Sequence, residues 1–221
     1  MTLQQMQAAE ALGDAHVGTS ADTPLRSDAF DVTDEEKIAR IEPLFAEIMD
    51  IIGLDRSDDS LAGTPRRVAK MYIQEIFKGL NPANHPHVKT FDNSYGYGDL
   101  LLERNINLNS TCEHHFLPIH GVAHVAYKSS GRVVGLSKIN RLVDFYAKRP
   151  QVQERLTRQI AEALKTLLNT EHVAVVIDAK HMCVSSRGIE DQSSSTVTVD
   201  FHGDFKKKEV RQELLSHIHG A

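Results

Sequence analysis

The sequence predicts an α+β fold in which an antiparallel sheet packs paired helices on one face and follows an N-terminal helical region. Apolar residues recur at helical spacing in the first third of the chain. Further along, the periodic segments follow the order strand, strand, helix, helix, strand, strand. Strand pairs on either side of two amphipathic helices can form one sheet that the helices then cover.

The first thirty residues, 1–30, form a poorly defined N-terminal extension. They are rich in Ala, Gln, Thr and Asp and show only weak periodicity. That composition is typical of a loosely attached helix or of a disordered segment. We assign no chemistry to this extension.

A first helix is expected after residue 33. Thr33 and Glu36 have the spacing of a capping box, in which each side chain bonds the backbone N–H of the other residue. Apolar residues then recur every three or four positions up to Gly53, so the segment predicts an amphipathic helix.

A second helix is expected from Thr64 to Gly79. Thr64 followed by Pro65 is typical of an N-cap and a first helical residue, because proline lacks an N–H that would otherwise need a partner. The outer face of this helix carries Arg67 and Lys70.

A long loop is expected over residues 81–98, which are dense in Pro, Asn, Gly, His and Tyr and lack periodicity. We therefore expect an N-terminal helical region and loop over 31–98 and a catalytic domain over 99–221.

The expected elements of the second region come from alternation, helical spacing and β-branched runs. An antiparallel strand pair is expected first, then a helix that Ser137 caps and a helix that Pro150 opens, then two strands and a last helix. In order they cover 106–112, 122–127, 137–146, 150–167, 173–179, 196–201 and 206–218.

Composition excludes several classes of protein. A length of 221 residues allows one sizeable core, and no apolar run approaches the roughly 18 residues of a membrane span. The formal net charge of −5 argues against binding nucleic acid through the overall field. Without a basic leader or an apolar signal segment, the chain is expected to be cytoplasmic.

Both cysteines of the chain lie in short clusters that also contain histidines. Cys112, His115 and Cys183 make a Cys₂His set, which leaves a tetrahedral zinc one open position for a water molecule, as catalytic zinc sites do. Either cysteine alone would more readily be a buried apolar residue, but together they favour a metal over a disulfide.

Two further histidines lie beside these ligands. His181 and Cys183 are two residues apart at an expected strand end, so their side chains should point the same way. His114 is the remaining imidazole of the first cluster. Histidines that are not ligands but lie beside an activated water suit general acid and base catalysis near neutral pH.

Basic residues at helix starts suggest phosphate binding. Ser137, Lys138 and Arg141 share the beginning of one helix, where free backbone N–H groups attract anions. Arg67 and Lys70 lie in the first turns of another expected helix, and Arg187 follows Cys183 by four positions. A solvated charged face explains each helix equally well taken alone.

Gln153 and Glu154 follow Pro150 closely. A carboxylate in a first helical turn is stabilised by the helix dipole, which is sufficient to explain Glu154. The alternative is recognition, because one carboxylate can accept from both the ring N–H and the exocyclic amine of a guanine.

Four motifs in the same order resemble the GTP cyclohydrolase I family. The likeness runs from about Ile38 to Phe205 and does not include the N-terminal extension. The motifs are Ser110–Phe116, Gly135–Arg141, Arg149–Leu156 and His181–Cys183.

The resemblance implies a tunnelling fold, a homodecamer of two pentamers with active sites between subunits, and conversion of GTP and water to formate and 7,8-dihydroneopterin triphosphate. It implies zinc on Cys112, His115 and Cys183, and proton transfer by His114 and His181 with help from Ser137. It assigns the guanine to Gln153 and Glu154. The triphosphate goes to Arg67, Lys70, Lys138, Arg141 and Arg187.

Two alternatives remain open at this stage. In a zinc-binding regulatory domain without catalysis, His114 or His181 would close the metal site as a fourth ligand. A related pterin or deazapurine enzyme would be expected to carry a different set of histidines or a lone catalytic cysteine.

Overall fold

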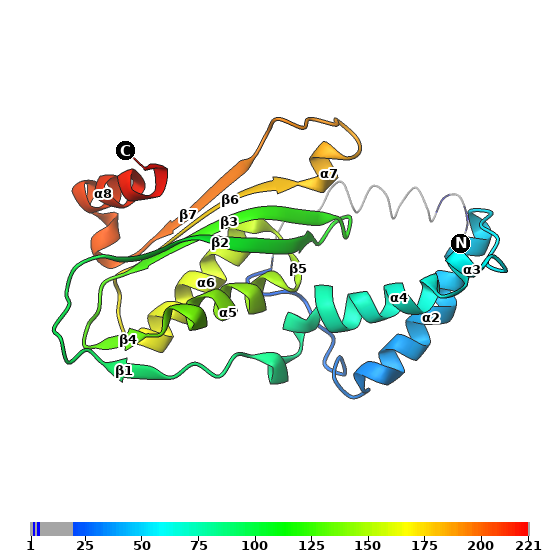
Figure 1. Ribbon diagram of the computed structural model, residues 1–221, viewed down its shortest axis with the longest axis horizontal. Coiled ribbons are helices and arrows are strands. Elements are labelled where there is room, and N and C mark those ends of the chain that lie inside the picture. The colour runs from blue at the N-terminus through cyan, green and yellow to red at the C-terminus, as the bar shows by residue number, and fades with distance from the viewer. Residues whose placement is uncertain (1, 3, 5–19, 221) are drawn as a thin grey trace.

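The structure is a computed structural model, and it describes residues 2, 4 and 20–220 (Figure 1). Most of the extension over 1–30 lies outside the described residues, so the expectation for it concerns mainly positions on which the structure gives no information. Among the helices that are described, none is long and apolar enough to cross a membrane.

The N-terminal region begins with helix α2, Asp34–Ile51, and its predicted capping box is confirmed. The Thr33 hydroxyl accepts from the Glu36 backbone N–H at 3.2 Å, and the Glu36 carboxylate accepts from the Thr33 N–H at 2.7 Å. A short helix α3, Asp59–Ala62, follows.

The second predicted helix is shorter than expected. Helix α4 covers Thr64–Lys70, and Gly63 rather than Thr64 is its N-cap. The chain then widens into a π-helix, η1, over Met71–Ile76, where the Phe77 N–H bonds the Tyr72 carbonyl. The 3₁₀ turns η2, Lys78–Leu80, and η3, Pro82–Asn84, complete the region.

The expected loop over 81–98 contains a strand that the sequence analysis missed. Strand β1, Thr90–Asp92, pairs with β4, Arg132–Val134, in a separate two-stranded sheet. The guanidinium of Arg132 bonds the Asp92 carboxylate at 2.6 Å across this pair. Three residues give too little alternation to distinguish a strand from a loop.

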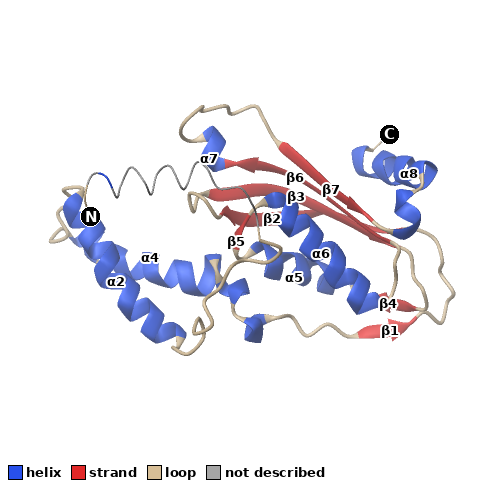
Figure 2. Ribbon diagram, turned by 180° about the vertical axis from the view of Figure 1, so that it is seen from behind, coloured by secondary structure: helices blue, strands red, loops and turns tan. Residues whose placement is uncertain are grey.

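The main sheet has five strands in the order β5-β2-β3-β6-β7 (Figure 2). The predicted antiparallel pairing of the first two long strands is confirmed, and all neighbours are antiparallel except β5 and β2. The strands are β2, Leu101–Cys112; β3, Pro118–Tyr127; β5, Pro150–Gln151; β6, Val173–His181; and β7, Thr196–Phe201.

Two predicted helix starts are wrong. Pro150 does not open a helix: it lies in β5, where Pro150 pairs with Thr111, and helix α6, Gln153–Leu168, begins after it. Ser137 does not cap helix α5, Leu136–Ala147, because Gly135 holds the N-cap position.

The core lies between the sheet and helices α5 and α6, which cover one face (Figure 1). Alternate residues of β3 and β6 meet apolar residues of both helices, as the period of two along a strand requires. Each fully buried aliphatic side chain contributes about 1.5–3 kcal/mol. The central members are Leu108, Ala123, Val125, Ile139, Leu142, Leu156, Ile160, Leu164, Val175 and Ile177.

The opposite face of the sheet is not bare, which corrects the expectation of helices on one face only. The turn η4, Gly203–Lys206, and the helix α8, Lys208–His219, pack there through Phe205 and Leu214 against Ala126 and Ala174.

Candidate active site

The first predicted cluster lies in a tight turn between β2 and β3. Cys112 ends β2, its carbonyl accepts from the Phe116 N–H at 2.9 Å, and its N–H donates to the Leu117 carbonyl at 2.8 Å. Phe116 takes a positive φ of 54°, which lets the chain reverse before β3. The turn thereby brings His115 back toward Cys112.

The second cluster lies on the neighbouring strand. His181 ends β6 opposite Ile119 of β3, so it lies at the same end of the sheet as the turn. The expectation that His181 and Cys183 share one strand is wrong, because the chain enters a short helix, α7, Met182–Ser185.

The predicted metal ligands come together. The ligand atoms of Cys112, His115 and Cys183 all lie within 4.8 Å of one another. One tetrahedral zinc with bonds of about 2.0–2.3 Å can be reached by all three with small side-chain adjustments. Both cysteines are free thiols, so the expectation of no disulfide is confirmed.

The electrostatics of the thiols suit a cation. Burial raises the pKa of Cys183, and the neighbouring Cys112 raises it further. Two adjacent thiolates repel each other in a partly buried place, and a bound divalent cation would reverse this penalty.

His114 lies between two groups that flank it in the sequence. Its Nδ1 is 3.8 Å from the Cys112 sulfur, and its Nε2 is 3.9 Å from the Glu113 carboxylate. Its side chain is exposed, so it can meet a ligand that enters the site.

His181 is held by Gln153. The Gln153 amide nitrogen donates to the carbonyls of Thr196, at 2.8 Å, and Ile177, at 3.1 Å, so its oxygen must face His181. That oxygen lies 2.8 Å from Nε2 of His181, which is therefore the protonated nitrogen. Burial lowers the pKa of His181, and the charge of Glu154 only partly opposes this.

These groups border one cavity of about 560 Å³. Its lining joins the end of the sheet to the first turns of α6 and includes both cysteines, both non-ligand histidines, and two residues predicted to bind substrate. They are Cys112, His114, Gln153, Glu154, His181 and Cys183. Glu154 is exposed, whereas Gln153 is 1% exposed.

The predicted phosphate-binding residues lie elsewhere, with one exception. Arg187 donates to Nε2 of His115 at 2.9 Å. Arg141 borders a separate cavity of about 480 Å³ with Lys78 and Asp144. Among the described residues that line the catalytic cavity, none belongs to the remaining predicted set of Arg67, Lys70, Ser137 and Lys138.

Sequence reasoning missed three residues of this cavity. Arg158 lies one helical turn after Glu154, and its spacing of four gave a signal that could have been used. Arg155 and Gln151 also border the cavity, but both are buried, and nothing in the sequence distinguishes them from the polar face of an amphipathic helix.

Comparison with known proteins agrees with this site. The sequence profile of the family described as GTP cyclohydrolase I matches residues 41–219. The protein named GTP cyclohydrolase 1 from Flavobacterium johnsoniae is 59% identical over 209 residues, which are 95% of this chain and 94% of that protein. The protein of the same name from Yersinia enterocolitica is 50% identical over 211 residues, 95% of each chain. The chain therefore belongs to the GTP cyclohydrolase I family.

Proposed function

We propose that this chain hydrolyses and rearranges GTP to formate and 7,8-dihydroneopterin triphosphate, the first step toward folates or related pterins. Family membership supports the reaction. The single observation that carries it is the meeting of a Cys₂His group and two further histidines at one cavity.

Zinc is the metal that this donor set fits best, because thiolate and imidazole ligands together select it over magnesium or calcium. Cys112, His115 and Cys183 would hold it. A zinc ion held there supplies a Lewis acid that makes water nucleophilic near neutral pH.

The two non-ligand histidines have different surroundings and hence different proposed roles. His114 faces the cavity and protonates the imidazole nitrogen of the guanine as C8 is attacked. His181 carries its proton on Nε2, so Nδ1 is the acceptor. With Ser137, His181 moves protons while the ribose opens, rearranges and closes onto the exposed amine.

Glu154 selects the guanine. Its carboxylate is exposed at the cavity, where it accepts from the ring N–H and the exocyclic amine together. The proposed role of Gln153 is narrower than expected, because its side-chain amide is engaged with His181 and two backbone carbonyls.

The triphosphate needs cations that one copy of the chain does not bring to the cavity. Of the predicted set, Arg187 alone contacts the metal group, whereas Lys138 and Arg141 start a helix some distance along the sheet. We propose that neighbouring copies complete each site, with Arg67, Lys70, Ser137, Lys138 and Arg141 supplied across a subunit boundary.

Two surfaces support a homo-oligomer, which we propose to be the family's tunnelling-fold decamer of two pentamers. Within the described part of the chain, β7 pairs on one side only, with Val197 and Val199 more than half exposed. Helix α2 exposes an apolar face made of Leu44, Ile48, Ile51 and Ile52.

We keep the division into an extension over 1–30, a helical region and loop over 31–98 and a catalytic domain over 99–221. Two free cysteines at a metal group suit a reducing compartment, so we propose a cytoplasmic enzyme with no nucleic-acid or membrane partner.

The test is direct. The purified protein, loaded with zinc, is incubated with GTP, and formate is measured together with the fluorescent pterin that forms on oxidation. Stoichiometric formate and pterin from GTP but not from ATP are expected. A protein with full zinc occupancy and the expected assembly that releases no formate would instead favour a regulatory zinc domain.

A further inference from the structure

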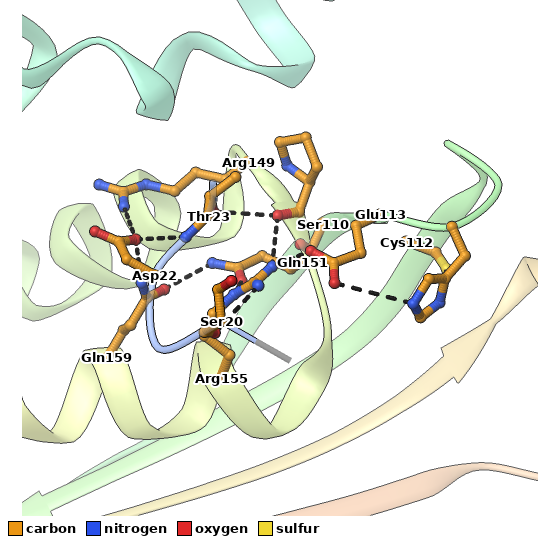
Figure 3. Close-up of polar contacts among 12 residues, drawn as sticks. Ser20, Asp22, Thr23, Ser110, Cys112, Glu113, Arg149, Gln151, Arg155 and Gln159 are labelled. Atoms are coloured by element: carbon orange, nitrogen blue, oxygen red, sulfur yellow. Dashed lines mark hydrogen bonds and ion pairs between the residues drawn. The ribbon is translucent and has the colours of Figure 1, made fainter. Parts of the chain in front are cut away.

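Arg155 is a buried cation directly behind the turn that carries the metal ligands. It lies on α6, and its side chain is 3% exposed. Its guanidinium bonds the Glu113 carboxylate, the Gln151 side-chain oxygen at 2.9 Å and the Pro150 carbonyl at 3.0 Å (Figure 3). One side chain thus ties α6, β5 and the turn together.

Glu113 is fixed through both its backbone and its side chain. Its N–H donates to the Gln151 carbonyl at 3.0 Å, while one carboxylate oxygen takes the bond from Arg155. The other oxygen lies 3.9 Å from Nε2 of His114. Figure 3 shows the carboxylate between the guanidinium and the imidazole ring.

Stability alone is a poor explanation of this arrangement. Removing a guanidinium from water costs several kcal/mol, and an apolar side chain of similar volume often serves a core as well or better. The pair lies where the chain must hold a short turn with a positive φ at Phe116, beside the catalytic cavity. A rigid charged contact fixes direction as well as distance, because the planar guanidinium fork has set donor geometry.

We propose that Arg155 and Glu113 are positioning residues that act on His114, the guanidinium fixing the carboxylate and the carboxylate fixing the imidazole ring. The inference rests on the proposed function in that His114 moves a proton. It assigns no contact with substrate to either residue. His114 is thereby held beside Cys112 at the cavity edge instead of turning toward solvent.

The experiment compares Glu113→Gln, Arg155→Met and the double variant with wild type, all as full-length, zinc-loaded protein. The amide of Glu113→Gln keeps the shape of the carboxylate, and the double variant leaves no unpaired buried charge. Asp92→Asn is the matched control, because Asp92 also pairs with an arginine, Arg132, but lies away from the cavity.

Each single variant is expected to lower kcat about 10–100-fold, the usual effect of removing a partner that orients a catalytic side chain. KM for GTP should change less than about threefold, and zinc should remain stoichiometric. The double variant should be no worse than the weaker single variant, because the two residues act as one unit. Asp92→Asn should match wild type.

A second readout does not depend on turnover. Diethylpyrocarbonate should modify His114 several-fold faster in Glu113→Gln and Arg155→Met than in wild type or Asp92→Asn, as followed by peptide mass spectrometry. If wild type proves inactive on GTP, the proposed function fails, and this rate still decides the positioning claim. Unchanged kcat and unchanged modification, loss of zinc in step with activity, or additive losses in the double variant would each overturn it.

Discussion

Arg187 donates to Nε2 of His115 over 2.9 Å, although 72 positions separate the two residues along the chain. A guanidinium has donors only, so this ring nitrogen accepts. The contact places a permanent positive charge at the predicted metal group, within reach of anionic groups that approach it. The metal group and an anion-binding cation therefore belong to one site.

We expect Cys112→Ser, His115→Ala and Cys183→Ser each to lose zinc and activity while the assembly survives. Three protein ligands leave no spare donor, so the loss of any one weakens binding sharply. Metal analysis by mass spectrometry and size-exclusion chromatography measure the two outcomes.

The matched control for the metal is His114→Ala. His114 lies outside the three-ligand group, so this variant should keep its zinc while losing turnover. Loss of zinc in His114→Ala would mean that the site is closed by a fourth protein ligand, and full occupancy in Cys183→Ser would contradict the ligand set.

We expect Glu154→Gln to lower kcat/KM for GTP by about 100-fold or more, because the guanine N–H groups lose an acceptor in a site built for them. Steady-state kinetics with GTP check this. Glu162→Gln, on the same helix and outside the catalytic cavity, is the control and should match wild type. Wild-type kinetics in Glu154→Gln would leave only a helix-dipole role for this carboxylate.

We expect Arg141→Ala to raise KM for GTP at least about tenfold and KM for guanosine hardly at all, because the lost interaction is with phosphate charge. Added salt should weaken GTP binding more in wild type than in the variant. Kinetics with GTP, GMP and guanosine measure both effects.

Lys165→Ala serves as the control for Arg141, since Lys165 pairs with Glu162 and Glu171 at the far end of α6. Equal losses for all three substrates in Arg141→Ala would assign Arg141 to the fold or to a subunit contact.

We expect acid to destabilise the protein partly through His124. This residue of β3 is 5% exposed, and burial lowers its pKa; His219 and Arg104 lower it further, while Asp178 opposes them. Below the ordinary histidine pKa of about 6.5 the unfolded chain binds a proton that the folded chain resists, so stability is full above that pH and falls as pH decreases.

The measurement is the thermal midpoint of wild type and His124→Gln at pH 7.5 and pH 5.5. The drop between the two should be smaller in the variant. His120→Gln, exposed on the same strand, should keep the wild-type drop. An identical drop in His124→Gln would assign the acid sensitivity to other groups.

Local chemistry made much of the fold predictable. The capping box of Thr33 and Glu36 involves four consecutive residues, so sequence contains all of its information. Cys112 and Cys183 were brought together by rarity of type: when a chain has two cysteines, each near histidines, few explanations fit both.

Long-range contacts decided what the sequence did not predict. Pro150 has the local features of a helix start, but pairing with Thr111 places it in a strand. The hydrogen bonds of Gln153 depend on carbonyls of β6 and β7, so its engagement with His181 has no local signal. Arg155 likewise meets Glu113 across 42 positions.

The open edge of β7 sets a time limit on the life of a newly made chain. Its unpaired backbone groups and its exposed Val197 and Val199 can pair with any strand that arrives, whether from a sister subunit or from a misfolded neighbour. Correct assembly and aggregation thus compete for the same surface, and their balance depends on how soon a second folded copy is encountered. Variants that slow association should accumulate as insoluble protein in cells before any defect in catalysis can be seen.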